Sequence, residues 1–339
     1  MKNLKVLLIN PARGYMQDFM DWISSNVHEI TIEEKLLKTI YSPSILTKKQ
    51  NLIQIIINVL QGVRPAFSFR SYEVILLNGN LIAPPILLLR RLFGMNLHKS
   101  RIIVIHFFLN DIRHHSLVKK LVRYIFDQPG ITMIALSKGD QEHYAKLFKH
   151  AHVDYYPLCF NDKPDLESEL VENGEYIFSG GWTNRDYECL ISAARRVSHQ
   201  FIIICSEKNK LPELPNNVKV LRDIPNTVFK RYVRDSQFVV VPLKNNVGAA
   251  GQMVALAALM YGKPVIYTDL PCISDYIENG VSGLAYRQGD DVDLEKKINL
   301  LVNEPSLSES LGKAASERFY ALFRPECFFQ HLTHIICKS

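Results

Sequence analysis

Short apolar runs alternate along this chain with longer segments in which apolar residues recur every three or four positions. The runs are typical of strands buried on both faces of a parallel sheet, and the longer segments of the helices that cover it. Strands are predicted over 5–10, 72–77, 101–108, 131–137, 153–156, 238–242 and 264–267, and near Tyr176, Phe201, Val218 and Leu284. Helices are predicted over 117–126, 140–149, 252–261 and 324–336. Residues 27–70 are poorly patterned for strands and are predicted to be helical and irregular.

The alternation of strand and helix occurs twice, on either side of a polar and acidic segment at residues 161–174. This segment contains Lys163-Pro164 and is interpreted as an interdomain linker. A chain of 339 residues is long enough for two domains of ordinary size. The pattern therefore predicts an α/β protein with two doubly wound parallel sheets.

A loop of small residues, Gly248 to Gly251, separates the predicted strand 238–242 from the helix 252–261. Small residues let backbone N–H groups approach a ligand, and the first N–H groups of a helix attract anions. The loop therefore predicts either a phosphate or diphosphate site or, with about equal weight, only close packing of a helix on the sheet.

Composition narrows the class of protein. With 47% apolar and 22% charged residues the chain is globular. No apolar stretch is long enough to span a bilayer, and the N-terminus is interpreted as a first strand and not a signal peptide. All six cysteines lie in the second half without Cys-x-x-Cys spacing, which argues against zinc and disulfides and favours a reducing cytosol.

Charge is distributed unevenly. Residues 1–150 carry 20 Lys and Arg against 10 Asp and Glu, a net charge of +10, whereas the remainder carries −4. A basic first half suggests an anionic partner. Because no stacking aromatics are interleaved with the basic clusters, we expect an anionic membrane surface and no nucleic acid.

The order of motifs from Pro242 through Gly262-Lys-Pro-Val-Ile266 to Asn279-Gly-Val-Ser-Gly-Leu284 resembles the donor-binding half of GT-B glycosyltransferases of the retaining family numbered four, the group 1 type. The resemblance covers most of 176–319. It implies two Rossmann-like domains facing across a cleft, an acceptor domain at 1–165, a nucleotide-sugar domain at 166–323, and a helix at 324–339 that crosses back to the first domain.

The resemblance also implies which residues bind the donor. Arg185 stands where the family has a phosphate-binding lysine, Lys244 would share the diphosphate charge, and Arg222 lies where relatives hold the base. The expected donor-side residues are Gly180, Gly181, Arg185, Arg222, Lys244, Gly248, Ala250, Gly251, Gln252 and Met253.

Three positions depart from the family pattern. Two glutamates that normally touch the sugar and the ribose are replaced by Ala249 and Ala257, and a usual arginine is replaced by Gly180. A methyl group accepts no hydrogen bond, so these contacts are lost or supplied elsewhere.

On the acceptor side the candidates are His106 and Asp111 as catalytic groups, with Arg13 and Gly14 in the loop after the first strand. His106 ends an apolar strand, and a histidine there either positions or deprotonates a hydroxyl or is simply buried and satisfied by backbone groups. No metal is expected, because the adjacent His114 and His115 point apart and no third ligand is evident.

Helix 117–126 places Leu117, Leu121 and Tyr124 on one side, with Lys119, Lys120 and Arg123 near the other. Such a helix either lies on anionic lipid or is an ordinary surface helix with a solvated face.

These observations predict a glycosyltransferase that moves a hexose from a nucleotide diphosphate sugar, a UDP-sugar before a GDP-sugar, to a hydroxyl of a glycan or lipid-linked oligosaccharide. The resemblance further implies retention of configuration and a role in surface polysaccharide such as lipopolysaccharide or capsule. It also implies no cofactor, and a cytoplasmic place on the inner face of the cell membrane. The alternatives are a non-catalytic glycosyltransferase-like subunit that binds a partner or glycan, and a nucleotide-sugar epimerase of the same architecture.

Overall fold

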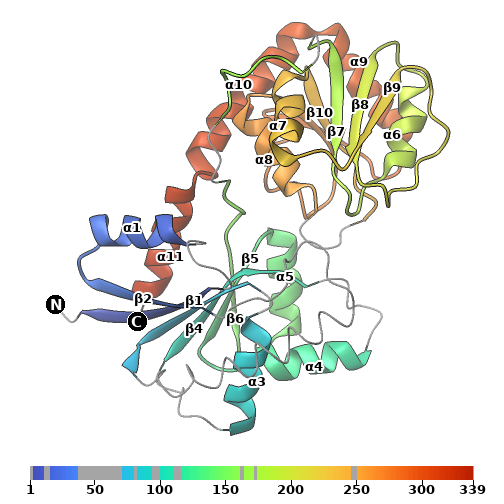
Figure 1. The fold of residues 1–339 in the computed structure, drawn as a ribbon. Coiled ribbons are helices and arrows are strands. Elements are labelled where there is room, and N and C mark those ends of the chain that lie inside the picture. Colours follow the sequence, from blue (N-terminus) through green and yellow to red (C-terminus); the bar gives the residue numbers. More distant parts are fainter. Residues whose placement is uncertain are drawn as a thin grey trace. The chain divides into compact units, whose positions relative to one another are not determined.

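The computed structural model describes residues 3–10, 16–36, 71–79, 82–93, 100–109, 116–160, 164–171, 174–245 and 250–338. The chain divides into two compact units. Unit 1 comprises Met1–Tyr156 and Phe328–Ser339, and unit 2 comprises Pro157–Cys327. Each unit is built around one parallel sheet with helices packed on it (Figure 1).

The sheet of unit 1 has the strand order β2-β1-β3-β4-β5-β6, with all neighbours parallel. Its strands are β1 (Leu4–Asn10), β2 (Ile30–Leu36), β3 (Val74–Asn78), β4 (Arg101–Phe107), β5 (Ile131–Ala135) and β6 (His152–Tyr155). The described helices are α1 (Gln17–Asn26), α3 (Ala83–Phe93), α4 (Ser116–Phe126) and α5 (Lys138–Leu147), and α11 (Pro325–Cys337) adds its last turns to this unit. β1 and β3 are almost wholly buried, as their continuous apolar runs predict.

Strand β2 corrects the prediction of helical and irregular structure for residues 27–70. Residues Ile30–Leu36 pair in parallel with β1 along its whole length, from Leu4 opposite Ile30 to Asn10 opposite Leu36. β2 is an edge strand that buries Ile30 and exposes Thr31 and Glu33 to solvent. Because an edge strand tolerates polar residues on its open side, the segment lacks the apolar run of a central strand.

The sheet of unit 2 has the order β12-β11-β10-β7-β8-β9 and is also parallel throughout. Its strands are β7 (Tyr176–Gly180), β8 (Gln200–Cys205), β9 (Val218–Arg222), β10 (Phe238–Val241), β11 (Val265–Thr268) and β12 (Gly283–Tyr286). The helices are α6 (Tyr187–Ala194), α7 (Asn226–Asp235), α8 (Gln252–Met260), α9 (Asp291–Asn303) and α10 (Pro305–Leu322).

Successive residues of the central strands enter two separate cores. Phe178 and Val239 pack into a cluster with α8, whereas Ile177 and Val240 pack into a cluster with α6 and α9. This alternation is what a sheet covered by helices on both faces requires. Together the two sheets confirm the predicted α/β class with two doubly wound units.

The units divide at Tyr156 and Pro157, earlier than the predicted boundary at residue 165. The reason is that residues before the polar linker already pack on unit 2. The backbone N–H of Leu158 donates to the Tyr276 hydroxyl at 2.8 Å, and Phe160 is buried in the unit 2 core.

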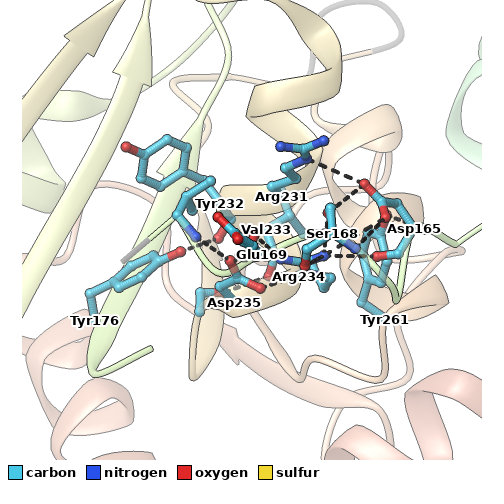
Figure 2. Close-up of polar contacts among 12 residues, drawn as sticks. Asp165, Ser168, Glu169, Tyr176, Arg231, Tyr232, Val233, Arg234, Asp235 and Tyr261 are labelled. Atoms are coloured by element: carbon cyan, nitrogen blue, oxygen red, sulfur yellow. Dashed lines mark hydrogen bonds and ion pairs between the residues drawn. The ribbon is translucent and has the colours of Figure 1, made fainter. Parts of the chain in front are cut away.

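A buried arginine holds the following segment in place (Figure 2). The Arg234 guanidinium donates to both carboxylate oxygens of Asp235, at 2.5 and 3.0 Å, and to the carbonyls of Asp165, Ser168 and Glu169. Asp235 in turn accepts the backbone N–H of Val171 at 2.9 Å. We call residues 165–171 with this pair the linker clamp.

Helix α11 belongs to unit 1 from Phe328 onward, where Phe328, Leu332 and Ile336 are buried. The Arg101 guanidinium at the start of β4 donates to the carbonyls of Ile335 and Ile336 near the helix end, at 3.2 and 2.5 Å. Such bonds satisfy carbonyls that have no partner within a helix. Across the described ranges, none of the helices has the length and apolar character that crossing a membrane requires.

Candidate functional site

The strand order of unit 2 reverses between β7 and β10. From β7 the chain proceeds through β8 to β9, then returns to the other side of β7 and continues through β10 to β12. In open parallel sheets the crevice outside the carboxyl ends of the strands at such a reversal is where ligands bind. The loops after β7 and β10 meet there: the backbone of Arg185 bridges that of Leu243.

A pocket of about 250 Å³ opens at this point. The loop after β7, helices α7 and α8, and one residue that precedes the linker enclose it. Its lining is Gly181, Trp182, Thr183 and Arg185 after β7, Asn226, Phe229 and Lys230 of α7, Ala250, Gly251, Met253, Val254 and Ala257 at α8, and Phe160. All of these residues belong to unit 2.

Arg185 is the central charge of the pocket. Its Nε donates to the Gly180 carbonyl and its Nη1 to the Thr183 carbonyl, both at 2.8 Å. Within the described residues neither a carboxylate nor a hydrogen-bond acceptor pairs with Nη2. Burial therefore lowers the pKa of Arg185 from its usual range. A buried cation without a counter-ion is costly, and an anion in the pocket offsets that cost.

Gly251 starts helix α8 with its backbone in the left-handed region, at φ 85°. A Cβ at this position would lie 2.7 Å from Cγ1 of Val241, so glycine is required both by conformation and by space. The N–H groups at the start of the nine-residue helix have no acceptor within it and lie beside the pocket lining of Met253 and Val254. The helix end and Arg185 thus present positive charge to the same pocket.

Two further glycines shape the loop after β7. Gly181 has φ 112°, and a Cβ there would lie 2.4 Å from Nη2 of Arg185. A Cβ on Gly180 would lie 2.5 Å from Cζ of Phe229, which itself lines the pocket. The ring of Phe229 therefore occupies the space into which a side chain at position 180 would extend.

No aspartate or glutamate is among the described residues that line the pocket. Ala257, which the resemblance aligns with one of the family's glutamates, is buried and faces this space, as does Ala250. Gln252 is turned away: its Nε2 donates to the Cys272 carbonyl at 3.1 Å, and its Oε1 is buried without a partner in the part of the chain that the structure describes.

Lys244 and Arg222 are not part of this lining. Lys244 is exposed, and its backbone is held by Asn184 and Gln288. Arg222 donates through Nη1 to the carbonyls of Ser206 and Asn209, at 2.8 and 3.2 Å, so part of its guanidinium supports its own neighbouring loop. Gly248 lies outside the described residues, as do Arg13, Gly14 and Asp111.

In unit 1 the corresponding reversal lies between β1 and β3. Asn10 and Asn78 end these two strands and are buried, and Asn78 donates to Asn10 at 3.0 Å. His106 lies near the end of the next strand, at φ 55°, where the register of β4 against β5 shifts. Its ring stacks on Phe328, and burial lowers its pKa to about 4. A neutral histidine with a left-handed backbone near the end of a central strand is a candidate polar site.

Four pocket residues were not predicted from the sequence: Trp182, Asn226, Phe229 and Lys230. Trp182 is exposed and follows the glycine pair directly, which is the signal that would have found it. The three α7 residues carried no such signal, because an amphipathic helix does not reveal which neighbour its first turns face.

Comparison with known proteins bears on this site. Residues 206–318 match the family model of glycosyl transferases group 1. This match confirms the predicted group 1 resemblance and spans β9 to α10, including Gly251 and α8. The uncharacterized glycosyltransferase MJ1178 of Methanocaldococcus jannaschii is 26% identical over 159 residues, 44% of this chain. The match likewise covers 44% of that curated relative, so this chain spans less than half of the relative's length.

Solved structures show the same fold over almost the whole chain. Sucrose-phosphate synthase from Thermosynechococcus elongatus superposes with a TM-score of 0.71 at 15% identity, covering 98% of each chain. Anabaena Alr3699/HepE in complex with UDP and glucose superposes with a TM-score of 0.66 at 13% identity, covering 98% of this chain and 99% of the other. The architecture is therefore that of the GT-B glycosyltransferases.

Proposed function

We propose that this protein is a glycosyltransferase whose unit 2 pocket binds the diphosphate of a nucleotide sugar. One observation carries the proposal: the Arg185 guanidinium is buried, has no carboxylate partner among the described residues, and lines a pocket at the N-terminus of α8. Nη2 of the arginine and the helix N–H groups together can donate charge-assisted hydrogen bonds to a diphosphate. The group 1 match over 206–318 supports a sugar donor as the source of this diphosphate.

The chemistry assigned to the pocket is stabilisation of a leaving group. When the bond between the sugar carbon and the diphosphate breaks, negative charge grows on the phosphate oxygen. Nη2 of Arg185 and the first amides of α8 stabilise this charge without a metal. A bond then forms between the sugar carbon and the acceptor oxygen, and the acceptor proton passes to the departing phosphate. This proton route corresponds to the retaining mechanism expected from the resemblance.

His106 is proposed to position the acceptor hydroxyl in unit 1 and not to remove its proton. With a pKa of about 4 the ring is neutral and is a weak base near neutral pH. Its imidazole can still accept a hydrogen bond. The proposed acceptor is a hydroxyl of a glycan or lipid-linked oligosaccharide for surface polysaccharide, modified on the cytoplasmic side of the membrane. No cofactor is proposed.

The donor is tested by calorimetric titration of the full chain with UDP, GDP and their common sugars. We expect UDP or a UDP-sugar to bind at micromolar strength. Arg185→Met should weaken binding by about ten- to a hundredfold, since a charge-assisted bond contributes about 1.5–3 kcal/mol. Arg185→Lys, which keeps the charge, should recover part of it. Gly251→Val should abolish binding, because its side chain would meet Val241.

Lys210→Met is the matched control: it removes an exposed cation of unit 2 outside the pocket lining and should leave affinity unchanged. If no nucleotide binds, or if both Arg185 variants bind as the wild type does, the donor assignment is wrong. Release of nucleoside diphosphate only when an acceptor is present then separates a transferase from an epimerase and from a binding subunit.

The second candidate is a non-catalytic glycosyltransferase-like subunit. Ala257 faces the pocket where an acidic side chain would hold hydroxyl groups, and this observation favours binding without turnover. Against it, a protein that needs no diphosphate gains nothing from burying Arg185 without a carboxylate partner among the described residues. Micromolar nucleotide binding with no diphosphate release over a panel of hydroxyl acceptors would favour this candidate.

A further inference from the structure

Helix α4 exposes an apolar surface that does not contribute to the core. Leu117 is 78% exposed and Leu121 55%, and Val118 and Tyr124 are also exposed. At about 100° per residue, Leu117, Leu121 and Tyr124 fall within about 60° of one another on the helix surface. These three residues therefore form one stripe, which we call the α4 stripe.

A different side of the same helix packs on unit 1. Ile125 and Phe126 are buried in the unit 1 core, and Val122 packs against it. The helix thus has two apolar sides, whereas an ordinary surface helix needs only the inner one. Exposed leucines in a contiguous patch mark an interaction surface.

The surface beside the stripe is positively charged. Lys119, Lys120 and Arg123 are all exposed, and Arg91 of the neighbouring helix α3 lies 5.0 Å from the Tyr124 ring centroid. The helix itself contains no acidic residue. The nearest one along the chain, Asp127, is turned inward, where its carboxylate accepts the backbone N–H groups of Lys149, His150 and Ala151.

We propose that α4 is a docking surface for an anionic lipid membrane. The α4 stripe enters the boundary between headgroups and acyl chains, while Lys119, Lys120 and Arg123 remain among the anionic headgroups. Apolar burial and headgroup attraction are the two contributions that hold an amphipathic helix in a membrane interface. The surplus of positive charge in residues 1–150 adds a long-range attraction to the same anionic lipid.

Charge complementarity decides between a membrane and a second copy of this chain. In a twofold interface the same patch meets itself, so three exposed cations of one copy would approach those of the other. A bilayer rich in anionic lipid presents the opposite charge across the whole face. This surface lies in unit 1 and does not depend on the proposed donor pocket, so either assignment can fail without the other.

The test is sedimentation of the full chain with vesicles of phosphatidylglycerol mixed with phosphatidylcholine, and with phosphatidylcholine alone. We expect binding to the anionic vesicles only, weakened by salt. Leu117→Ser with Leu121→Ser should lower the partition coefficient at least about tenfold, because two leucines lose their burial. Lys119→Glu with Lys120→Glu should lower it similarly.

Leu166→Ser with Leu170→Ser is the matched control, because these leucines of unit 2 are 71% and 67% exposed. This pair should bind vesicles as the wild type does. Light scattering of each variant measures its oligomeric mass. The proposal is overturned if the wild type binds neutral vesicles equally well or binds none. It is also overturned if Leu117→Ser with Leu121→Ser leaves vesicle binding unchanged. The same holds if the wild type is an oligomer that binds no vesicles and these two substitutions dissociate it.

Discussion

Replacing Arg234 by methionine tests how much the linker clamp stabilises unit 2. The Arg234 side chain is 8% exposed and that of Asp235 1%, so the substitution leaves a carboxylate buried without its cation. Removing one partner of a buried ion pair costs about 3–5 kcal/mol. The hydrogen bonds to the carbonyls of Asp165, Ser168 and Glu169 are lost as well, but these lie in a part-buried segment that water can reach.

The assay is urea unfolding followed by circular dichroism, with hydrogen exchange to localise the effect. With a slope of about 2 kcal/mol per molar urea, the unit 2 transition of Arg234→Met should move down by about 2 M. The amide of Val171, which donates to Asp235, should exchange faster. Arg231→Met is the matched control: this arginine of the same helix makes one exposed pair with Asp165, so the loss should stay below about 1 kcal/mol.

A double variant isolates the buried charge. Adding Asp235→Asn to Arg234→Met removes the unpaired carboxylate and should recover part of the lost stability. The reasoning is refuted if the free energy of unfolding of Arg234→Met lies within about 1 kcal/mol of the wild-type value. It is also refuted if adding Asp235→Asn to Arg234→Met lowers the free energy of unfolding as much as Asp235→Asn lowers it in the wild type.

Three further predictions concern single residues. Gly180→Ala should cost about 1–3 kcal/mol in thermal unfolding, because its Cβ would meet the Phe229 ring, and Phe229→Leu should relieve the loss. Burial lowers the pKa of His106 to about 4 in the folded protein, below its ordinary 6.5. The unfolded chain therefore binds the proton first, and the free energy of unfolding should fall as pH drops from about 6.5 to 4. His106→Asn, a residue type that tolerates φ 55°, should flatten this slope in urea titrations at a series of pH values. Arg101→Met should speed hydrogen exchange at the end of α11 by removing bonds to its carbonyls; unchanged exchange there would contradict the capping role.

The sequence was most informative where strands are buried on both faces. β10 and β11 were located because central strands of a parallel sheet are continuous apolar runs, and the loop at Gly251 follows from the need for φ 85° at the helix start. Edge strand β2 was missed for the opposite reason: its alternating apolar and charged residues also suit a helix or loop.

Side-chain partners were less predictable than elements. Arg222 lies at the end of β9 as expected, yet it donates to the backbone of a neighbouring loop, and sequence does not distinguish such an acceptor from a ligand. The stripe of Leu117 and Leu121 shows the same limit. A helical period predicts that these residues share one side, but whether that side meets the core or the solvent depends on the packing of the whole unit.

The close approach of Gly180 and Phe229 constrains how this protein can change over generations. A side chain at position 180 would collide with Phe229, because Cζ of that ring lies 2.5 Å from where a Cβ would stand. A larger residue at position 180 is therefore expected to be tolerated better once Phe229 has been replaced by a smaller residue, and the reverse order passes through a less stable intermediate. The two positions are therefore expected to be epistatic: the cost of a side chain at position 180 depends on which residue occupies position 229.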